Sequence, residues 1–155
     1  MNTVAAFIIA QVVAIGMLFT AVIVLDKSLT NKLSVTGMIS LRCGFSIYTG
    51  WLCVANILNI SFVMKSLGFS EASNPDINET LWTVGTMIAA EGVYVFVSYM
   101  MRNPLYACVW IWAMSGIRDE SSAYADIVTT ANVLLICHGC YIVGLTTYLI
   151  VNKIK

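Results

Sequence analysis

The run VAAFIIAQVVAIGMLFTAVIVL, from Val4 to Leu25, decides what kind of protein this chain forms. It contains no charged residue, and about 20 such apolar residues are enough to cross the hydrocarbon core of a bilayer as a helix. The run is too long for the core of a signal peptide. It also lacks the basic start and the small-residue cleavage site of such a peptide. We therefore expect a retained transmembrane helix here.

The composition of the whole chain agrees with a membrane protein. Of its 155 residues, 59% are hydrophobic and 10% are charged, whereas about 25% of the residues of a soluble domain are charged. The formal net charge is zero and no basic run exists, so nothing indicates a nucleic-acid partner and we expect none. The lipid bilayer is the natural solvent for this chain.

Five apolar segments follow one another along the chain. Backbone groups in lipid must be satisfied within the segment, so long apolar segments become helices. Charged and turn-forming residues separate them at Asp26–Ser28, Gly68–Glu79, Arg102–Pro104 and Arg118–Ser122. The sequence predicts an all-α, polytopic membrane protein, a bundle of five transmembrane helices forming one domain over residues 1–155. The predicted segments are Thr3–Leu25, Leu41–Met64, Leu81–Met101, Pro104–Ile117 and Ile127–Val151.

The distribution of basic residues supports five crossings. With five, one membrane side carries six basic residues against Asp26 alone, as the positive-inside rule expects. A four-helix arrangement would move the last two of them across the membrane. We therefore predict the N-terminus outside and the C-terminus on the cytoplasmic or matrix side. The six basic residues are Lys27, Lys32, Arg42, Arg102, Lys153 and Lys155.

The fourth segment is short. Pro104–Ile117 spans about 21 Å as a helix, against about 30 Å of hydrocarbon. Snorkelling of Arg102 and Arg118 shortens the gap, and neighbouring helices would shield the rest. This favours a place inside a larger assembly.

Polar residues in the second segment recur every three or four positions, which puts them on one helical face. One interpretation is hydrogen bonding between helices, the usual role of such residues in membranes. The other is a ligand cavity lined by Asn56 and Asn59, with Tyr48 and Trp51 near one end. The residues of the stripe are Arg42, Ser46, Thr49, Cys53 and Asn56.

The fifth segment carries a second stripe of mostly small residues with the same spacing. Small residues allow close helix packing in membranes, so Thr130, Cys137, Cys140 and Gly144 are predicted to form a packing seam. Cys137 and Cys140 also flank His138, but no second Cys or His pair exists to complete four metal ligands. We predict no metal and no cofactor.

Glu91, within IAAEGVYVF (Ile88–Phe96), and His138 lie near the centres of their segments. Ionisable residues at this depth need a partner, and their matched depth predicts a buried hydrogen-bonded pair. A structural contact is favoured over proton transport, because a transport pathway needs a relay of such groups. No catalytic set of side chains and no phosphate-binding loop occurs, so we predict that the protein is not an enzyme.

Two stretches resemble the TspO/MBR family of tryptophan-rich sensory proteins. They are FSIYTGWLCVANILN, Phe45–Asn59, and NPLYACVWIWAMSGI, Asn103–Ile117. The resemblance covers about half of the chain. It implies a five-helix fold and a small hydrophobic ligand such as a porphyrin or sterol, with Tyr48, Trp51, Asn56 and Trp110 in the cavity. The chain departs from the porphyrin and sterol binders at Arg42–Phe45, where they are rich in tryptophan and proline.

Two classes of function follow from these observations. The first is an accessory subunit of a larger membrane complex, with a respiratory-chain complex of the mitochondrial inner membrane as host and a bacterial plasma membrane as the alternative location. The second is a TspO-like binder of a hydrophobic ligand, acting as a homodimer. A proton-coupled transporter ranks third.

Overall fold

The computed structural model describes residues 3–32, 34–69 and 78–154, and all the regular structure in these ranges is helical. The predicted all-α fold is confirmed. Most of the predicted break at Gly68–Glu79 lies outside the described residues, as does Lys155. The elements are α1 (Thr3–Thr30), α2 (Val35–Gly37), η1 (Met38–Cys43), α3 (Gly44–Ser66), α4 (Glu79–Met100), α5 (Pro104–Glu120) and α6 (Ala125–Ile154).

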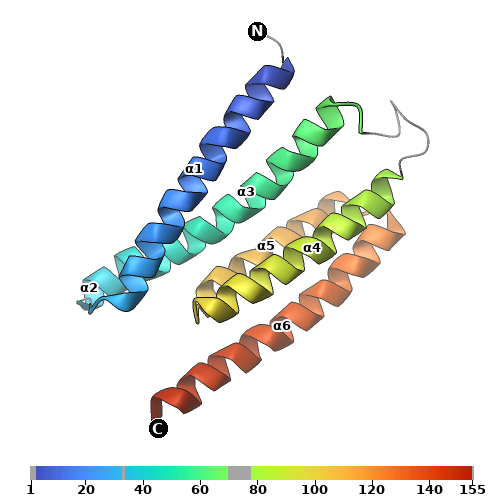
Figure 1. Ribbon diagram of the computed structural model, residues 1–155. Coiled ribbons are helices and arrows are strands. Elements are labelled where there is room, and N and C mark those ends of the chain that lie inside the picture. Colours follow the sequence, from blue (N-terminus) through green and yellow to red (C-terminus); the bar gives the residue numbers. More distant parts are fainter. Residues whose placement is uncertain (1–2, 33, 70–77, 155) are drawn as a thin grey trace. The chain divides into compact units, whose positions relative to one another are not determined.

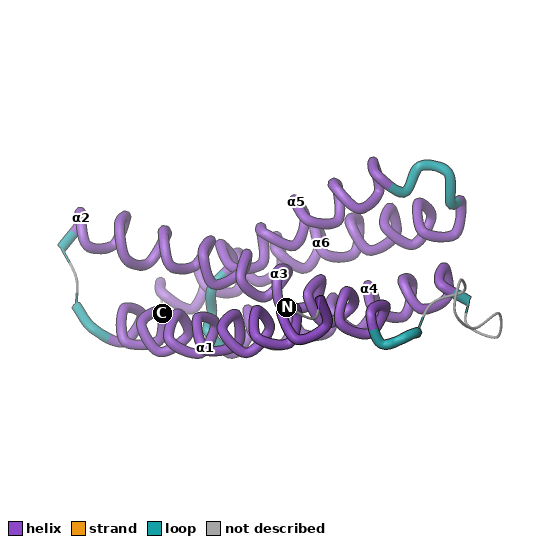
Figure 2. The backbone as a smooth tube through the Cα atoms, turned by 90° about the horizontal axis from the view of Figure 1, so that it is seen from above, coloured by secondary structure: helices purple, strands orange, loops and turns teal. Residues whose placement is uncertain are grey.

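The described residues form five helical rods, because α2, η1 and α3 run on without a break (Figure 2). The predicted start at Leu41 is therefore wrong, and this helix begins at Val35. The Oγ of Ser34 accepts a hydrogen bond from the backbone N–H of Gly37 at 3.2 Å. This cap stabilises the start of the helix. The residues between Val35 and Leu41 are too polar for a hydropathy pattern to show that they belong to a transmembrane helix.

Four helical stretches are long and apolar enough to cross a membrane: Val4–Thr30, Val35–Ser66, Glu79–Met100 and Ala125–Asn152. The fifth rod, α5, has 17 residues and a length of about 25 Å. It is longer than predicted, because it continues through Arg118 to Glu120. It still falls short of the about 30 Å of a hydrocarbon core.

The chain divides into two compact units, residues 1–82 and residues 83–155. The single domain over residues 1–155 stays a prediction.

In the first unit α1 packs along α3 (Figure 1). The rings of Phe7 and Phe62 stack with centroids 6.5 Å apart. Further along, the Gln11 amide donates to the Asn56 Oδ1 at 3.1 Å, and the Asn56 amide donates to the carbonyl of Ala14 at 3.2 Å. Apolar packing and a buried amide link thus fix the register of these two helices.

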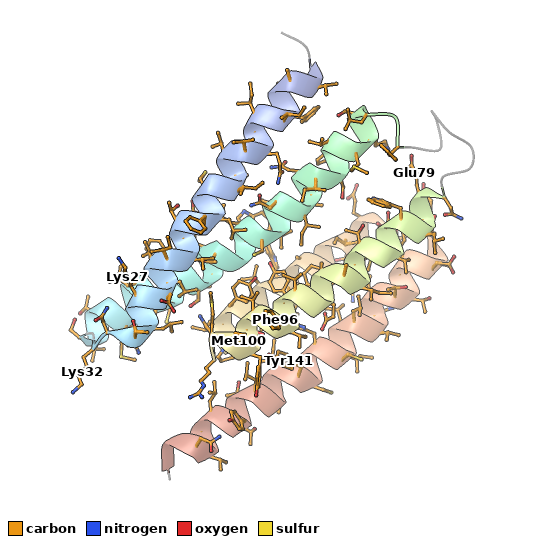
Figure 3. All side chains as sticks on the ribbon, in the orientation of Figure 1. Lys27, Lys32, Glu79, Phe96, Met100 and Tyr141 are labelled. Carbon is orange, nitrogen blue, oxygen red and sulfur yellow. The ribbon has the colours of Figure 1, made fainter. Side chains whose placement is uncertain are left out.

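The guanidinium of Arg42 closes the C-terminal end of α1. Its Nε donates to the carbonyl of Ser28 and its Nη2 to the carbonyl of Asn31, both at 2.7 Å. The last carbonyls of a helix have no intrahelical partner and carry the negative end of the helix dipole. A cation at this place explains why α1 continues past the predicted end at Leu25 to Thr30. Figure 3 shows Lys27 and Lys32 at this same end of the unit.

In the second unit α5 packs along α6, and a tight turn at Arg102 and Asn103 joins α4 to α5, as predicted. The N–H of Asn103 bonds to the carbonyl of Ser98 at 2.9 Å, and the N–H of Arg102 to that of Tyr99 at 3.1 Å. This is a Schellman helix end, whose left-handed position glycine usually occupies. Here Arg102 occupies it, with φ 49°. A left-handed residue other than glycine costs about 1–2 kcal/mol.

Three stacked aromatic rings lie in the core of the second unit. Tyr94 on α4 stacks between Tyr106 and Trp110 of α5, with ring centroids 5.0 and 4.9 Å from its own. All three side chains are buried. The stack therefore holds α4 and α5 together. It lies one helical turn from Glu91 on α4.

Candidate functional site

Glu91 and His138 meet inside the second unit. The Nδ1 of His138 on α6 lies 2.8 Å from the Oε1 of Glu91 on α4. The His138 side chain is fully buried, and that of Glu91 is 15% exposed. The structure thus brings together the two ionisable residues that the sequence places at matched depth.

A third helix completes this cluster. The indole Nε1 of Trp110 on α5 donates to the other carboxyl oxygen of Glu91, Oε2. On its other side, the Nε2 of His138 lies 3.1 Å from the carbonyl oxygen of Ala107, also on α5. We call Glu91, Trp110, His138 and the Ala107 carbonyl the polar lock, because they connect α4, α5 and α6.

The partners of the polar lock determine where its protons are. A carbonyl oxygen only accepts, so the Nε2 of His138 carries a hydrogen and donates it to Ala107. The remaining proton is shared between the Nδ1 of His138 and the Oε1 of Glu91. It makes either a neutral acid beside a neutral imidazole or a carboxylate beside an imidazolium. Trp110 donates to Glu91 in both cases.

The net charge of the Glu91–His138 pair is zero in either arrangement. This matters because an isolated charge in a low-dielectric interior is strongly unfavourable, whereas a hydrogen-bonded pair of zero net charge is tolerated. The polar lock can therefore lie among apolar helices without an external counter-ion.

A second polar contact lies on the same faces of α4 and α6. The hydroxyl of Tyr141 donates to the carbonyl of Val95 at 2.9 Å and lies 2.9 Å from the Oγ of Ser98. Figure 3 shows Tyr141 extending from α6 toward α4. This contact was not predicted from the sequence. The spacing along each helix is the signal that could have identified it. Tyr141 follows His138 by three residues and Ser98 follows Glu91 by seven, and both spacings put the two residues on the same helical face.

The residues predicted to line a cavity lie in different surroundings. Asn56 is buried and links α1 to α3, and its amide also donates to the carbonyl of Leu52 at 2.8 Å. Tyr48 and Trp51 are 41% and 43% exposed on α3, and Asn59 is half-buried. Trp110 belongs to the polar lock of the other unit. The structure therefore uses Asn56 and Trp110 as links between helices.

The packing face of α6 lies one residue away from the predicted seam. Cys137, Cys140 and Gly144 are exposed and Thr130 is half-buried, so they do not form the packing face within this unit, and a seam at these residues stays a prediction. One residue along a helix is a rotation of about 100°, and His138 and Tyr141 determine it by bonding to α4. The buried residues of α6 are Ile127, Ala131, His138 and Leu145.

No cluster of three or more His, Cys, Asp or Glu side chains that could hold a metal ion occurs in the described part of the chain.

The helices and the polar lock define an all-α, polytopic integral membrane protein. The chain belongs to the family of TSPO-like proteins, whose family model matches residues 3–144. This match runs from the start of α1 into α6 and confirms the family predicted from the two resembling stretches. A search of curated proteins and a search of solved structures each found no match.

Proposed function

We propose that this chain is a non-catalytic accessory subunit of a larger membrane complex, with the mitochondrial inner membrane as its location. The observation that supports this most directly is how the polar side chains of the helices are used. Glu91, His138 and Trp110 connect three helices of the second unit, and Asn56 connects the two helices of the first. These side chains stabilise the protein's own helix packing.

A transport role would need a different arrangement. Ionisable groups along a proton or ion path form a relay that continues toward both membrane surfaces. Here both ring nitrogens of His138 and both carboxyl oxygens of Glu91 already have partners. One of these partners is a backbone carbonyl, which cannot take up a proton in exchange. The polar lock is therefore better suited to holding helices than to moving protons.

The short helix α5 supports a place in an assembly. With about 25 Å of length, it leaves several ångströms of hydrocarbon uncovered at its ends. Thinning of the bilayer or contact with neighbouring helices would cover the difference. A complex supplies such neighbours permanently. The same proposal retains the N-terminus outside and the C-terminus on the matrix side.

The size of the native particle tests this proposal. Native membranes are solubilised in a mild detergent and separated by size, and the chain is followed with an antibody or a C-terminal tag. We expect co-migration with a complex many times the 16.9 kDa of the chain. Migration as an isolated monomer or homodimer would contradict the subunit role.

Family membership supports a second candidate, a homodimeric binder of a small hydrophobic ligand such as a porphyrin or sterol. The aromatic side chains Tyr48 and Trp51 are both more than two-fifths exposed on α3, so they are the cavity residues to test for contact with such a ligand. The test is a titration of the purified chain with haem, followed by tryptophan fluorescence. Saturable quenching that weakens in Trp51→Phe, but not in the control Trp82→Phe, would support binding. Quenching without saturation would count against it.

A further inference from the structure

A hollow of about 240 Å³ lies in the second unit, between the end of α4 and the C-terminal half of α6. A cavity of about 150 Å³ in another protein is large enough to take up benzene, so this one has room for a phosphate group. Figure 3 labels Met100, which is part of its wall. The lining residues are Tyr99, Met100, Arg102, Leu145 and Tyr148.

The lining of this hollow has a single charge, the guanidinium of Arg102. Among the residues that the structure describes, no carboxylate forms an ion pair with it. A guanidinium has five N–H donors in a planar fork that matches the oxygens of a phosphate. The phenol groups of Tyr99 and Tyr148 add two hydroxyl donors beside it. The hollow thus offers donors and positive charge.

The backbone at Arg102 points to a role beyond ending a helix. The left-handed position with φ 49° would suit glycine better. Strained backbone conformations of this kind concentrate at functional sites, where the side chain is needed. An arginine at this position is consistent with a side chain whose contacts offset the strain.

The hollow suits an anion, and its position along α4 indicates which kind of anion would bind there. The stretch of this helix that is long and apolar enough to cross a membrane ends at Met100, so we expect Arg102 at the level of the lipid headgroups. Tyrosine side chains are enriched at this level of membrane proteins. The buried Leu145 and the side chain of Met100 add an apolar wall that a free anion would not use.

We propose that this hollow binds the phosphate group of an anionic phospholipid. The guanidinium of Arg102 pairs with the phosphate oxygens, the hydroxyls of Tyr99 and Tyr148 donate to them, and Leu145 and Met100 contact the first part of an acyl chain. The lipid is anionic rather than zwitterionic, because a choline group would bring a second cation next to Arg102. This site does not depend on the subunit role proposed above.

The experiment uses the full chain in nanodiscs of phosphatidylcholine with a minor fraction of phosphatidylglycerol. Native mass spectrometry then measures which lipid stays bound after the disc is removed. Wild-type chain should retain phosphatidylglycerol, and Arg102→Gly should retain it roughly tenfold less, as expected for the loss of a charge-assisted hydrogen bond. Arg102→Gly also removes the backbone strain, so this variant should unfold at the same or a higher denaturant concentration. Tyr148→Phe should show a smaller loss.

Arg118→Gln is the matched control, because Arg118 is a basic residue at the other end of α5 whose guanidinium bonds to Asp119 at 2.8 Å. It should retain phosphatidylglycerol like the wild type. Equal retention by wild type and Arg102→Gly would overturn the proposal. Displacement of the lipid by inorganic phosphate at millimolar concentration would also overturn it, because the site would then be one for a free anion.

Discussion

The Oε1 of Glu91 and the Nδ1 of His138 lie 2.8 Å apart, with a backbone carbonyl beside the imidazole and an indole N–H beside the carboxyl group. The pair connects α4 to α6 and, through Trp110 and Ala107, both helices to α5. The two carboxyl oxygens of Glu91 and the two ring nitrogens of His138 thus all have partners within one unit of the protein. The first two predictions follow from this arrangement.

Replacing Glu91 by glutamine should leave the protein nearly as stable as the wild type. A glutamine amide can accept from Trp110 through its oxygen and donate to the Nδ1 of neutral His138 through its nitrogen. Glu91→Ala leaves both partners without a hydrogen bond and opens a void, with a loss of about 2–4 kcal/mol in the free energy of unfolding. Unfolding by SDS titration in mixed micelles, followed by circular dichroism, measures both values. Equal losses in the two variants would contradict this prediction, because they would show that the glutamine amide does not replace the hydrogen bonds of the carboxyl group.

The energy of the Glu91–His138 contact can be isolated by a double-mutant cycle of Glu91→Ala, His138→Ala and the double variant. We expect a coupling of about 1–2 kcal/mol, the upper part of the range for hydrogen bonds between membrane helices. The pair Glu91→Ala and Tyr148→Phe is the control, since Tyr148 does not belong to the polar lock. A coupling close to zero for Glu91 and His138 would mean that their contact contributes nothing to stability.

Arg42→Gln should weaken the C-terminal end of α1. The variant removes the cation that bonds to the carbonyls of Ser28 and Asn31. Loss of a charged partner at a helix end costs about 1 kcal/mol. Hydrogen exchange measured by mass spectrometry should show faster exchange in the last turns of α1. The control is Lys32→Gln, an exposed cation at the same end of the unit. If the last turns of α1 exchange at the same rate in both variants, the hydrogen bonds of Arg42 do not stabilise this helix end.

Asn56→Ala and Asn59→Ala should differ although both asparagines lie on α3. Asn56 accepts from Gln11 and donates to two carbonyls, so its loss should lower stability by about 1–2 kcal/mol. Asn59 is half-buried and should change stability by less than about 0.5 kcal/mol. The same SDS titration measures the difference. A larger effect at Asn59 would contradict the role of Asn56 as the link between α1 and α3.

The orientation of the chain can be tested with epitope tags at its two ends. Six basic residues on one side of five crossings predict an external N-terminus and a matrix or cytoplasmic C-terminus. In sealed vesicles with the outer face exposed, protease should remove the N-terminal tag and leave the C-terminal tag intact. Removal of both tags would require an even number of crossings.

The existence of the helices could be predicted from the sequence, because in lipid an apolar run has to be helical. The exact ends could not, since they depend on individual polar contacts outside the apolar runs. The Ser34 cap starts one helix before its apolar segment, and Arg42 extends another beyond Leu25. Such contacts join residues whose distance in space the sequence does not give.

The rotation of each helix about its axis was the least predictable property. A helix that faces lipid on one side and other helices on the other is apolar all round, so hydropathy contains little information about its inner face. The predicted seam at Cys137 and Cys140 thus lies one residue away from the face of α6 that is buried at His138. Glu91 and His138 could be identified because their depth depends only on position along the helix. Trp110 could not be assigned to them, because its role depends on the rotation of α5.

The shared proton of the polar lock also limits how the protein responds to a membrane potential. Moving one elementary charge across the whole membrane changes the energy by about 2.3 kcal/mol per 100 mV. A proton that passes between atoms 2.8 Å apart crosses at most about a tenth of a 30 Å hydrocarbon core. The electrical work is then about 0.2 kcal/mol per 100 mV, below the thermal energy of about 0.6 kcal/mol. We therefore expect the contact between Glu91 and His138 to be equally strong in an energised and in a depolarised membrane.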